Sequence, residues 1–140
     1  MRSYRIVFVA MLVCCSLLLT GYSAPRKKVK LPETYQIRNI HAGVAQEHDT
    51  QMVRDLCENF RMNEAEVREF FAKADEISAH VREYGYDWLP CYVRGELILD
   101  KKKTATWEIQ ASGTGWIKYP GGKTVHLGCK EACADLFKNK

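Results

Sequence analysis

The sequence predicts an α+β domain in which one amphipathic helix packs on a four-stranded antiparallel meander that disulfides lock in place. Three observations lead to this fold class. Residues 91–128 contain four short β-prone runs separated by turn-rich breaks, and an apolar stripe with helical spacing precedes them over residues 63–81. A third observation is that cysteines stand near both ends of the β-prone region, which is typical of a small domain closed by covalent bonds.

Residues 1–23 have the pattern of a secretory signal peptide. Arg2 and Arg5 give a charged start, and residues 6–21 are uncharged and mostly apolar, but shorter than the roughly 20 residues of a membrane span. Gly21 and Ser23 put small residues at the positions that signal cleavage after Ser23 requires. An uncleaved membrane anchor and, because of Cys14 and Cys15, a lipoprotein are the alternatives. We therefore expect a periplasmic or secreted protein.

Residues 24–50 are predicted to form a basic, largely flexible arm ahead of a single domain over residues 51–140. The arm holds the run RKKVK and no sustained apolar period. Six of the 21 basic residues lie in residues 1–30, so the remainder carries 15 basic against 17 acidic side chains. A nucleic-acid binder would carry its basic patch on the folded domain, so we expect no nucleic-acid partner. The arm could make weak contact with an anionic surface through Arg26, Lys27, Lys28 and Lys30.

The helix predicted over residues 63–81 has the clearest local signals. Asn63 is a good N-cap, and Glu66 can complete a capping box with it. The apolar stripe comprises Val67, Phe70, Phe71, Ala74, Ile77 and Val81. The preceding residues 51–62 fit both a helix and a strand, and we favour a short strand or an extended entry there.

The meander alternates apolar and polar residues with the period of two that a half-buried sheet requires. Val93 and Leu97 then share one face, while Tyr92 and Arg94 share the other. Trp116 joins Tyr92 and Arg94 unless a bulge near Gly113 or Gly115 reverses its direction.

Two aromatic residues precede the meander. Tyr86 and Trp88 either roof one end of the core or form a recognition patch.

After signal removal four cysteines remain, Cys57, Cys91, Cys129 and Cys133, and we expect all four to form disulfides. Three pairings are possible. We favour a connection of Cys57 and Cys91 to the C-terminal pair, because a link between Cys129 and Cys133 closes a very small loop. That local link remains the alternative if Cys57 and Cys91 pair with each other.

Several motifs in residues 57–137 resemble a group of small exported bacterial proteins. They are the order of Cys57 and Phe60, the helix opening at 63–67, the segment 87–95, Trp107-Glu-Ile, Gly121-Gly-Lys and the closing run 127–133. The resemblance implies export and paired cysteines, and it implies no activity. The group often ends in a tighter Cys-x-x-Cys, whereas three residues separate Cys129 from Cys133, which counts against a redox role.

The sequence contains no catalytic motif. G-x-S-x-G, H-E-x-x-H and P-loop patterns are absent, and the histidines at 41, 48, 80 and 126 are scattered. We therefore expect no catalytic residue, no metal and no cofactor. The alternative is a small secreted enzyme, or a redox or metal protein, that uses His126, Cys129 and Cys133.

What remains is a non-enzymatic binding module whose partner is an envelope or secreted protein, as for an inhibitor or an immunity protein. Tyr92, Arg94 and Trp116 are the leading contacts, since Tyr, Arg and Trp are favoured at interface hot spots. Tyr86 and Trp88 form the second candidate patch. The competing interpretation is that all five are ordinary surface or core residues.

Overall fold

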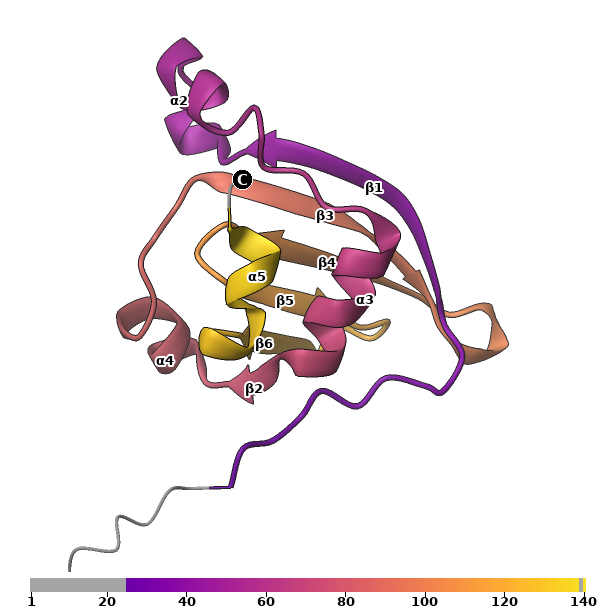
Figure 1. Cartoon of the computed structure of the whole chain (residues 1–140). Coiled ribbons are helices and arrows are strands. Elements are labelled where there is room, and N and C mark those ends of the chain that lie inside the picture. The colour runs from indigo at the N-terminus through magenta and orange to yellow at the C-terminus, as the bar shows by residue number, and fades with distance from the viewer. Residues whose placement is uncertain (1–24, 139) are drawn as a thin grey trace, which may run out of the picture.

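The computed structural model describes residues 25–138 and 140, so the predicted signal peptide lies outside the described residues (Figure 1). The fold is α+β, as expected, and it is built on one six-stranded sheet. The strand order is β1-β3-β4-β5-β6-β2, and each neighbouring pair is antiparallel. The strands are β1 (Gln36–Val44), β2 (Asp75–Ile77), β3 (Cys91–Ile98), β4 (Thr104–Gln110), β5 (Thr114–Lys118) and β6 (Thr124–Gly128).

Two of the helices cover one face of this sheet, which we call the inner face. Figure 1 shows α3 and α5 lying across it, while α2 projects from the end of β1. The helices are α2 (Gln51–Leu56), α3 (Glu64–Lys73), α4 (Ala79–Tyr84) and α5 (Ala134–Phe137). Short 3₁₀ turns span Gln46–His48, Asp100–Lys102 and Glu131–Cys133.

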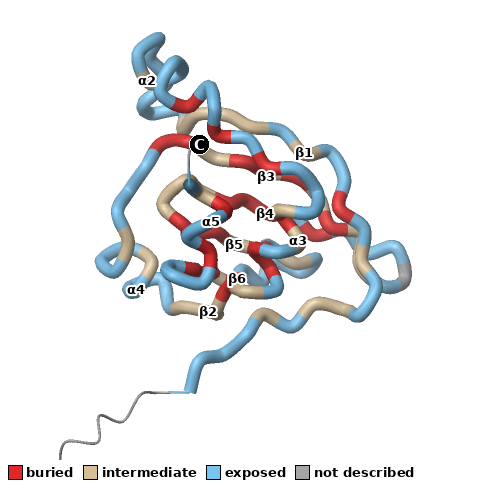
Figure 2. Tube along the Cα trace, in the orientation of Figure 1, coloured by how far each residue is buried: buried red, intermediate tan, exposed pale blue. Residues whose placement is uncertain are grey.

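The hydrophobic core lies between α3, α5 and the inner face, where the buried residues of Figure 2 concentrate. Trp107 is fully buried at its centre and meets Phe71 of α3 edge-on, with ring centroids 5.7 Å apart. Gly95 lies opposite Trp107 in the register, and a Cβ there would come within 2.8 Å of the indole. The glycine therefore makes room for the largest side chain of the core.

The expectation of four strands is wrong, because β1 and β2 extend the meander at its two edges. β1 lies within residues 24–50, which the sequence assigned to the arm. Its alternation is hidden by a register shift between Arg38 and His41, where Asn39 takes a positive φ of 54°. Ile37 is nevertheless buried opposite Leu97.

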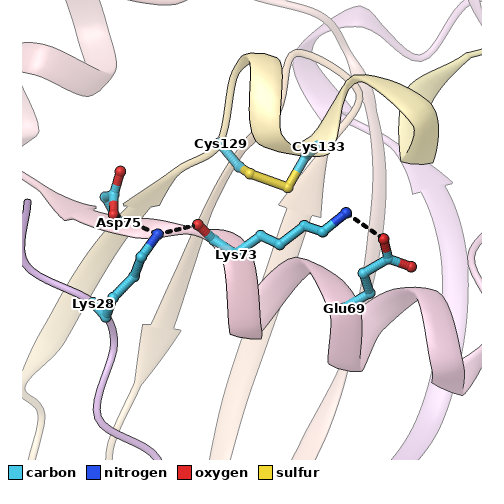
Figure 3. The surroundings of a disulfide bond; sticks show 6 residues. All are labelled: Lys28, Glu69, Lys73, Asp75, Cys129 and Cys133. Carbon is cyan, nitrogen blue, oxygen red and sulfur yellow. Dashed lines mark hydrogen bonds and ion pairs between the residues drawn. A yellow bond between two sulfur atoms is a disulfide. The ribbon is translucent and has the colours of Figure 1, made fainter.

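The basic residues before β1 contact the opposite edge of the sheet. Lys28 Nζ lies 2.8 Å from an Asp75 carboxylate oxygen of β2 and donates to the Lys73 carbonyl at 2.6 Å (Figure 3). Lys27 forms an ion pair with Glu76, and its carbonyl accepts from the Glu76 amide at 2.6 Å. Both lysines are therefore bound to β2.

The single helix expected over residues 63–81 is also wrong, although its start is confirmed. The Asn63 side chain accepts from the Glu66 amide at 3.0 Å, and Glu66 accepts from the Asn63 amide at 2.8 Å. The helix ends at Lys73 because Asp75–Ile77 pairs with β6 and Ser78 caps a new helix, α4. The tertiary pairing with β6 overrides a helical spacing that continues to Val81.

The favoured strand over residues 51–62 is wrong for its first half. Thr50 caps α2 by accepting from the Val53 amide at 3.3 Å, and the helix ends at Leu56. The chain becomes extended only from Phe60 onward.

All four described cysteines are paired, as expected, but the favoured connectivity is wrong. The bonds are Cys57–Cys91 and Cys129–Cys133, with Cα–Cα distances of 5.2 and 5.6 Å. The 3₁₀ turn at Glu131–Cys133 folds the chain back after β6, so a separation of four residues is enough. The first bond ties the end of α2 to the start of β3.

Candidate binding surface

The outer face of the sheet carries one row of aligned side chains across all six strands. His41 pairs with Arg94, Arg94 with Glu108, Glu108 with Trp116, Trp116 with His126, and His126 with Ile77. Directly opposed residues point to the same side of a sheet, so Trp116 shares its face with Arg94 and Tyr92. Gly113, which has a positive φ of 84°, lies in the turn before β5 and leaves this register intact. No bulge therefore turns the Trp116 side chain to the inner face.

Tyr92, Arg94 and Glu108 form a compact group on this face. The Arg94 guanidinium lies 3.7 Å from the centroid of the Tyr92 ring, and its Nη2 is 3.2 Å from a Glu108 carboxylate oxygen. The Tyr92 ring covers Gly43 of β1, where a Cβ would clash with it. Only 10 % of the Glu108 side chain is exposed, so its pairing with Arg94 offsets the cost of burying a carboxylate.

A chain of hydrogen bonds continues from Glu108 toward the end of β4. Gln110 Nε2 donates to the second Glu108 oxygen at 3.3 Å, and Thr114 Oγ1 donates to Gln110 Oε1 at 2.9 Å. The Ser112 and Thr114 hydroxyl oxygens lie 3.0 Å apart and share the last hydrogen bond of this chain. These bonds fix the side chains of Glu108, Gln110 and Thr114 in one arrangement.

Trp116 and His126 continue the row beyond Glu108, and both are half-buried. The Nδ1 atom of His126 is buried and has no hydrogen-bond partner among the described residues. Burial, with a smaller contribution from the nearby Arg82 guanidinium of α4, lowers the pKa of His126 below its ordinary value. The imidazole is therefore held in its neutral form near neutral pH.

Tyr86 and Trp88 separate in the structure. The Tyr86 ring lies against Gly128, where a Cβ would collide with the phenol hydroxyl. Tyr86 therefore covers the outer face at the C-terminal end of β6. Burial first, then the Asp75 and Glu131 carboxylates, raises the pKa of the Tyr86 hydroxyl. Trp88 stays more than half exposed and packs against His48, with ring centroids 4.5 Å apart.

An open groove lies between Tyr86, Trp88 and the end of β4. It has a volume of about 370 Å³, and its lining residues are Ala79, Arg82, Glu83, Tyr86, Asp87, Trp88, Gln110 and Thr114. One lining residue, Gln110, pairs with Tyr92 across the strands, so this side of the groove lies next to the Tyr92–Arg94 group. His41 and Arg82 border this face, and the sequence missed both because β1 and the break before α4 were not predicted.

The residues of the alternative metal or redox site do not come together as reactive groups. Cys129 and Cys133 are bonded to each other, and His126 points to the outer face. Within residues 25–138 and 140, no group of three or more His, Cys, Asp or Glu side chains is arranged to hold a metal ion. In the same part of the chain, no helix combines the length and the apolar character that crossing a bilayer requires.

Comparisons with protein-family models, curated proteins and solved structures find no significant match for this chain.

Proposed function

We propose that the protein is a non-enzymatic binding protein that acts outside the cytoplasm and recognises a protein partner through the outer sheet face. Tyr92, Arg94 and Trp116 are its leading contacts. One observation carries this proposal. The three side chains lie on one face, with Arg94 and Trp116 in one cross-strand row and Tyr92 stacked on Arg94, and α3 and α5 pack on the opposite face (Figure 1).

The make-up of the outer face favours a protein partner over a small molecule. Small-molecule sites are concave and mostly apolar, whereas this face is a sheet surface of mixed charge that carries the Arg94–Glu108 ion pair. Its Tyr, Arg and Trp side chains are the types that carry binding energy between proteins. The hydrogen bonds from Glu108 to Thr114 already order these side chains, so less conformational entropy would be lost when a partner binds.

A location in the periplasm or outside the cell agrees with the chemistry of the cysteines. The two disulfides are compatible with an oxidising compartment. We propose export with removal of residues 1–23, for which intact-mass analysis of the exported protein should give a chain that begins at Ala24. A full-length product in the cytosol would contradict export. Contact with an anionic surface is a weaker proposal, because Lys27 and Lys28 already pair with Glu76 and Asp75.

The test of the binding proposal is a titration against a partner captured from envelope extract and then purified. The variant Tyr92→Ala/Arg94→Ala/Trp116→Ala should remain folded and lose affinity by at least about two orders of magnitude, because each hot-spot truncation costs about 1–2 kcal/mol. A control variant, Arg68→Ala/Tyr35→Ala, removes a stacked arginine–tyrosine pair of the same kind on the α3 side of the sheet and should bind like the wild type. An unfolded triple variant, or a folded one that keeps its affinity, would reject the outer face as the site.

A further inference from the structure

A second surface lies at the α2 end of the molecule, beside the outer face. We call it the α2 lobe and define it as residues 45–59 and 87–90. The two segments are joined at three points: the Ala45 amide donates to the Pro90 carbonyl at 2.9 Å, His48 packs on Trp88, and the Cys57–Cys91 bond closes the base. Figure 1 shows α2 projecting from the end of the sheet, away from the helices that cover the core.

The α2 lobe exposes large apolar side chains that a soluble surface rarely leaves open together. Met52 is 80 % exposed, Leu56 67 %, Trp88 56 % and Leu89 39 %. They are four of the six large apolar residues that are exposed in the described part of the chain. Met52 and Leu56 stand four residues apart on α2 and therefore on one side of the helix. Such a concentration marks an interaction site rather than scattered surface.

The helix that presents Met52 and Leu56 is held in place by bonds at both of its ends. Thr50 caps α2, and Asp49 pairs with Arg54 at 2.6 Å beside the cap. Gln51 donates to Asp55 at 2.7 Å on the same helix. With the disulfide at Cys57, these bonds hold in place a helix of only six residues, which would be unstable alone.

The charge of the lobe selects the kind of partner. The lobe also carries five exposed carboxylates, against a single arginine, Arg54, which pairs with one of them. The five are Glu47, Asp49, Asp55, Glu58 and Asp87. An anionic membrane would repel these carboxylates, and a second copy of the lobe would bring carboxylates against carboxylates. A protein whose apolar groove is bordered by lysine and arginine side chains fits both the shape and the charge.

We propose that the α2 lobe is a docking element that inserts Met52, Leu56 and Trp88 into an apolar, basic-rimmed groove of a partner protein. Met and Trp are enriched at protein interfaces, and Met adapts to irregular grooves. This proposal does not depend on the outer sheet face being a binding surface.

The experiment places a photo-reactive phenylalanine derivative at position 52 or 56 of the full chain in the producing cell. Position 123, exposed in the β5–β6 turn, serves as the control. We expect adducts from 52 and 56 to the same protein and none from 123. The adducts should map to an apolar surface of that protein flanked by lysine or arginine. Adducts to lipid, to a second copy of this chain or to the chain's own residues would overturn the proposal, and so would the absence of any adduct.

The partner that the adducts identify is then purified in its free form, and its affinity for variants of this chain completes the test. The variant Met52→Ser/Leu56→Ser should keep the wild-type unfolding midpoint, since both side chains are exposed, and should raise Kd at least about tenfold. The charge variant Asp55→Lys/Glu58→Lys should slow association and flatten its salt dependence. An unchanged Kd in the first variant overturns docking by the lobe. Adducts from position 52 that persist in the Tyr92→Ala/Arg94→Ala/Trp116→Ala variant separate this surface from the outer sheet face.

Discussion

Two tryptophans on neighbouring strands show how the two faces of the sheet differ. Trp107 of β4 is fully buried against Phe71, whereas Trp116 of β5 pairs with Glu108, the residue next to Trp107, and stays half-buried on the outer face. The inner face is apolar and covered by α3 and α5, and the outer face holds a hydrogen-bonded polar row. The same residue type thus serves stability on one face and is available for recognition on the other.

The largest expected effect compares these two tryptophans directly. Trp107→Ala should cost about 3–5 kcal/mol of unfolding free energy, because it removes a fully buried side chain and leaves a cavity. Trp116→Ala should cost about 1 kcal/mol or less, as is usual for a residue outside the core. Urea denaturation of both variants measures the difference. Equal costs would mean that the outer face is part of the core.

The two disulfides should contribute unequally to the free energy of unfolding. Loop-closure entropy predicts about 4 kcal/mol for Cys57–Cys91, with its separation of 34 residues, and about 2 kcal/mol for Cys129–Cys133, with its separation of four. The serine pairs Cys57→Ser/Cys91→Ser and Cys129→Ser/Cys133→Ser should therefore differ by about 2 kcal/mol in urea unfolding. The reverse order would show that the turn after β6 matters more to the fold than the anchoring of α2.

Breaking the polar row of the outer face should have a moderate effect. Arg94→Ala leaves the nearly buried Glu108 carboxylate with Gln110 as its remaining side-chain donor, which should cost about 1–2 kcal/mol. Replacing Glu108 as well should recover part of this loss, and a double-mutant cycle on urea unfolding measures the coupling. Strictly additive costs would show that the pair contributes nothing to the outer face.

The smallest effect is a dependence of stability on pH through His126. Its pKa in the folded protein is lowered, chiefly by burial. Between the two pKa values the imidazole is therefore protonated in the unfolded chain but neutral in the folded protein. The free energy of unfolding should therefore fall as the pH drops through about 6.5, the unfolded value, and stop falling once the folded pKa is reached. The variant His126→Gln should lose this part of the pH dependence between pH 7.5 and 5.5. A variant with the wild-type slope would show that His126 does not contribute.

The sequence could predict the parts of the fold that local patterns encode. Asn63 and Glu66 predicted the start of α3, and the alternation within β3 placed Tyr92 and Arg94 on one face. These signals lie within one element or between adjacent strands, where residue spacing alone decides direction. The direction of Trp116 on β5 stayed open in the sequence, because it depended on whether a bulge occurs near Gly113 or Gly115.

The missed elements depend on contacts between distant parts of the chain. β2 is three residues long and exists because β6 and the segment around Lys28 pair with it, although its residues continue the helical spacing of α3. β1 is hidden by its bulge at Asn39. The α2 lobe depends on the Cys57–Cys91 bond, a pairing that cysteine positions alone could not select.

The central claim, that one face of the sheet is core and the other binds a partner, is tested most directly by hydroxyl-radical footprinting of the free and partner-saturated protein. We expect Tyr92 and Trp116 to be oxidised in the free protein and protected at least severalfold in the complex, with Trp107 unmodified in both. Oxidation of Trp116 at the same rate with and without the partner would contradict the binding role of the outer face. Oxidation of Trp107 in the free protein would contradict the assignment of the core.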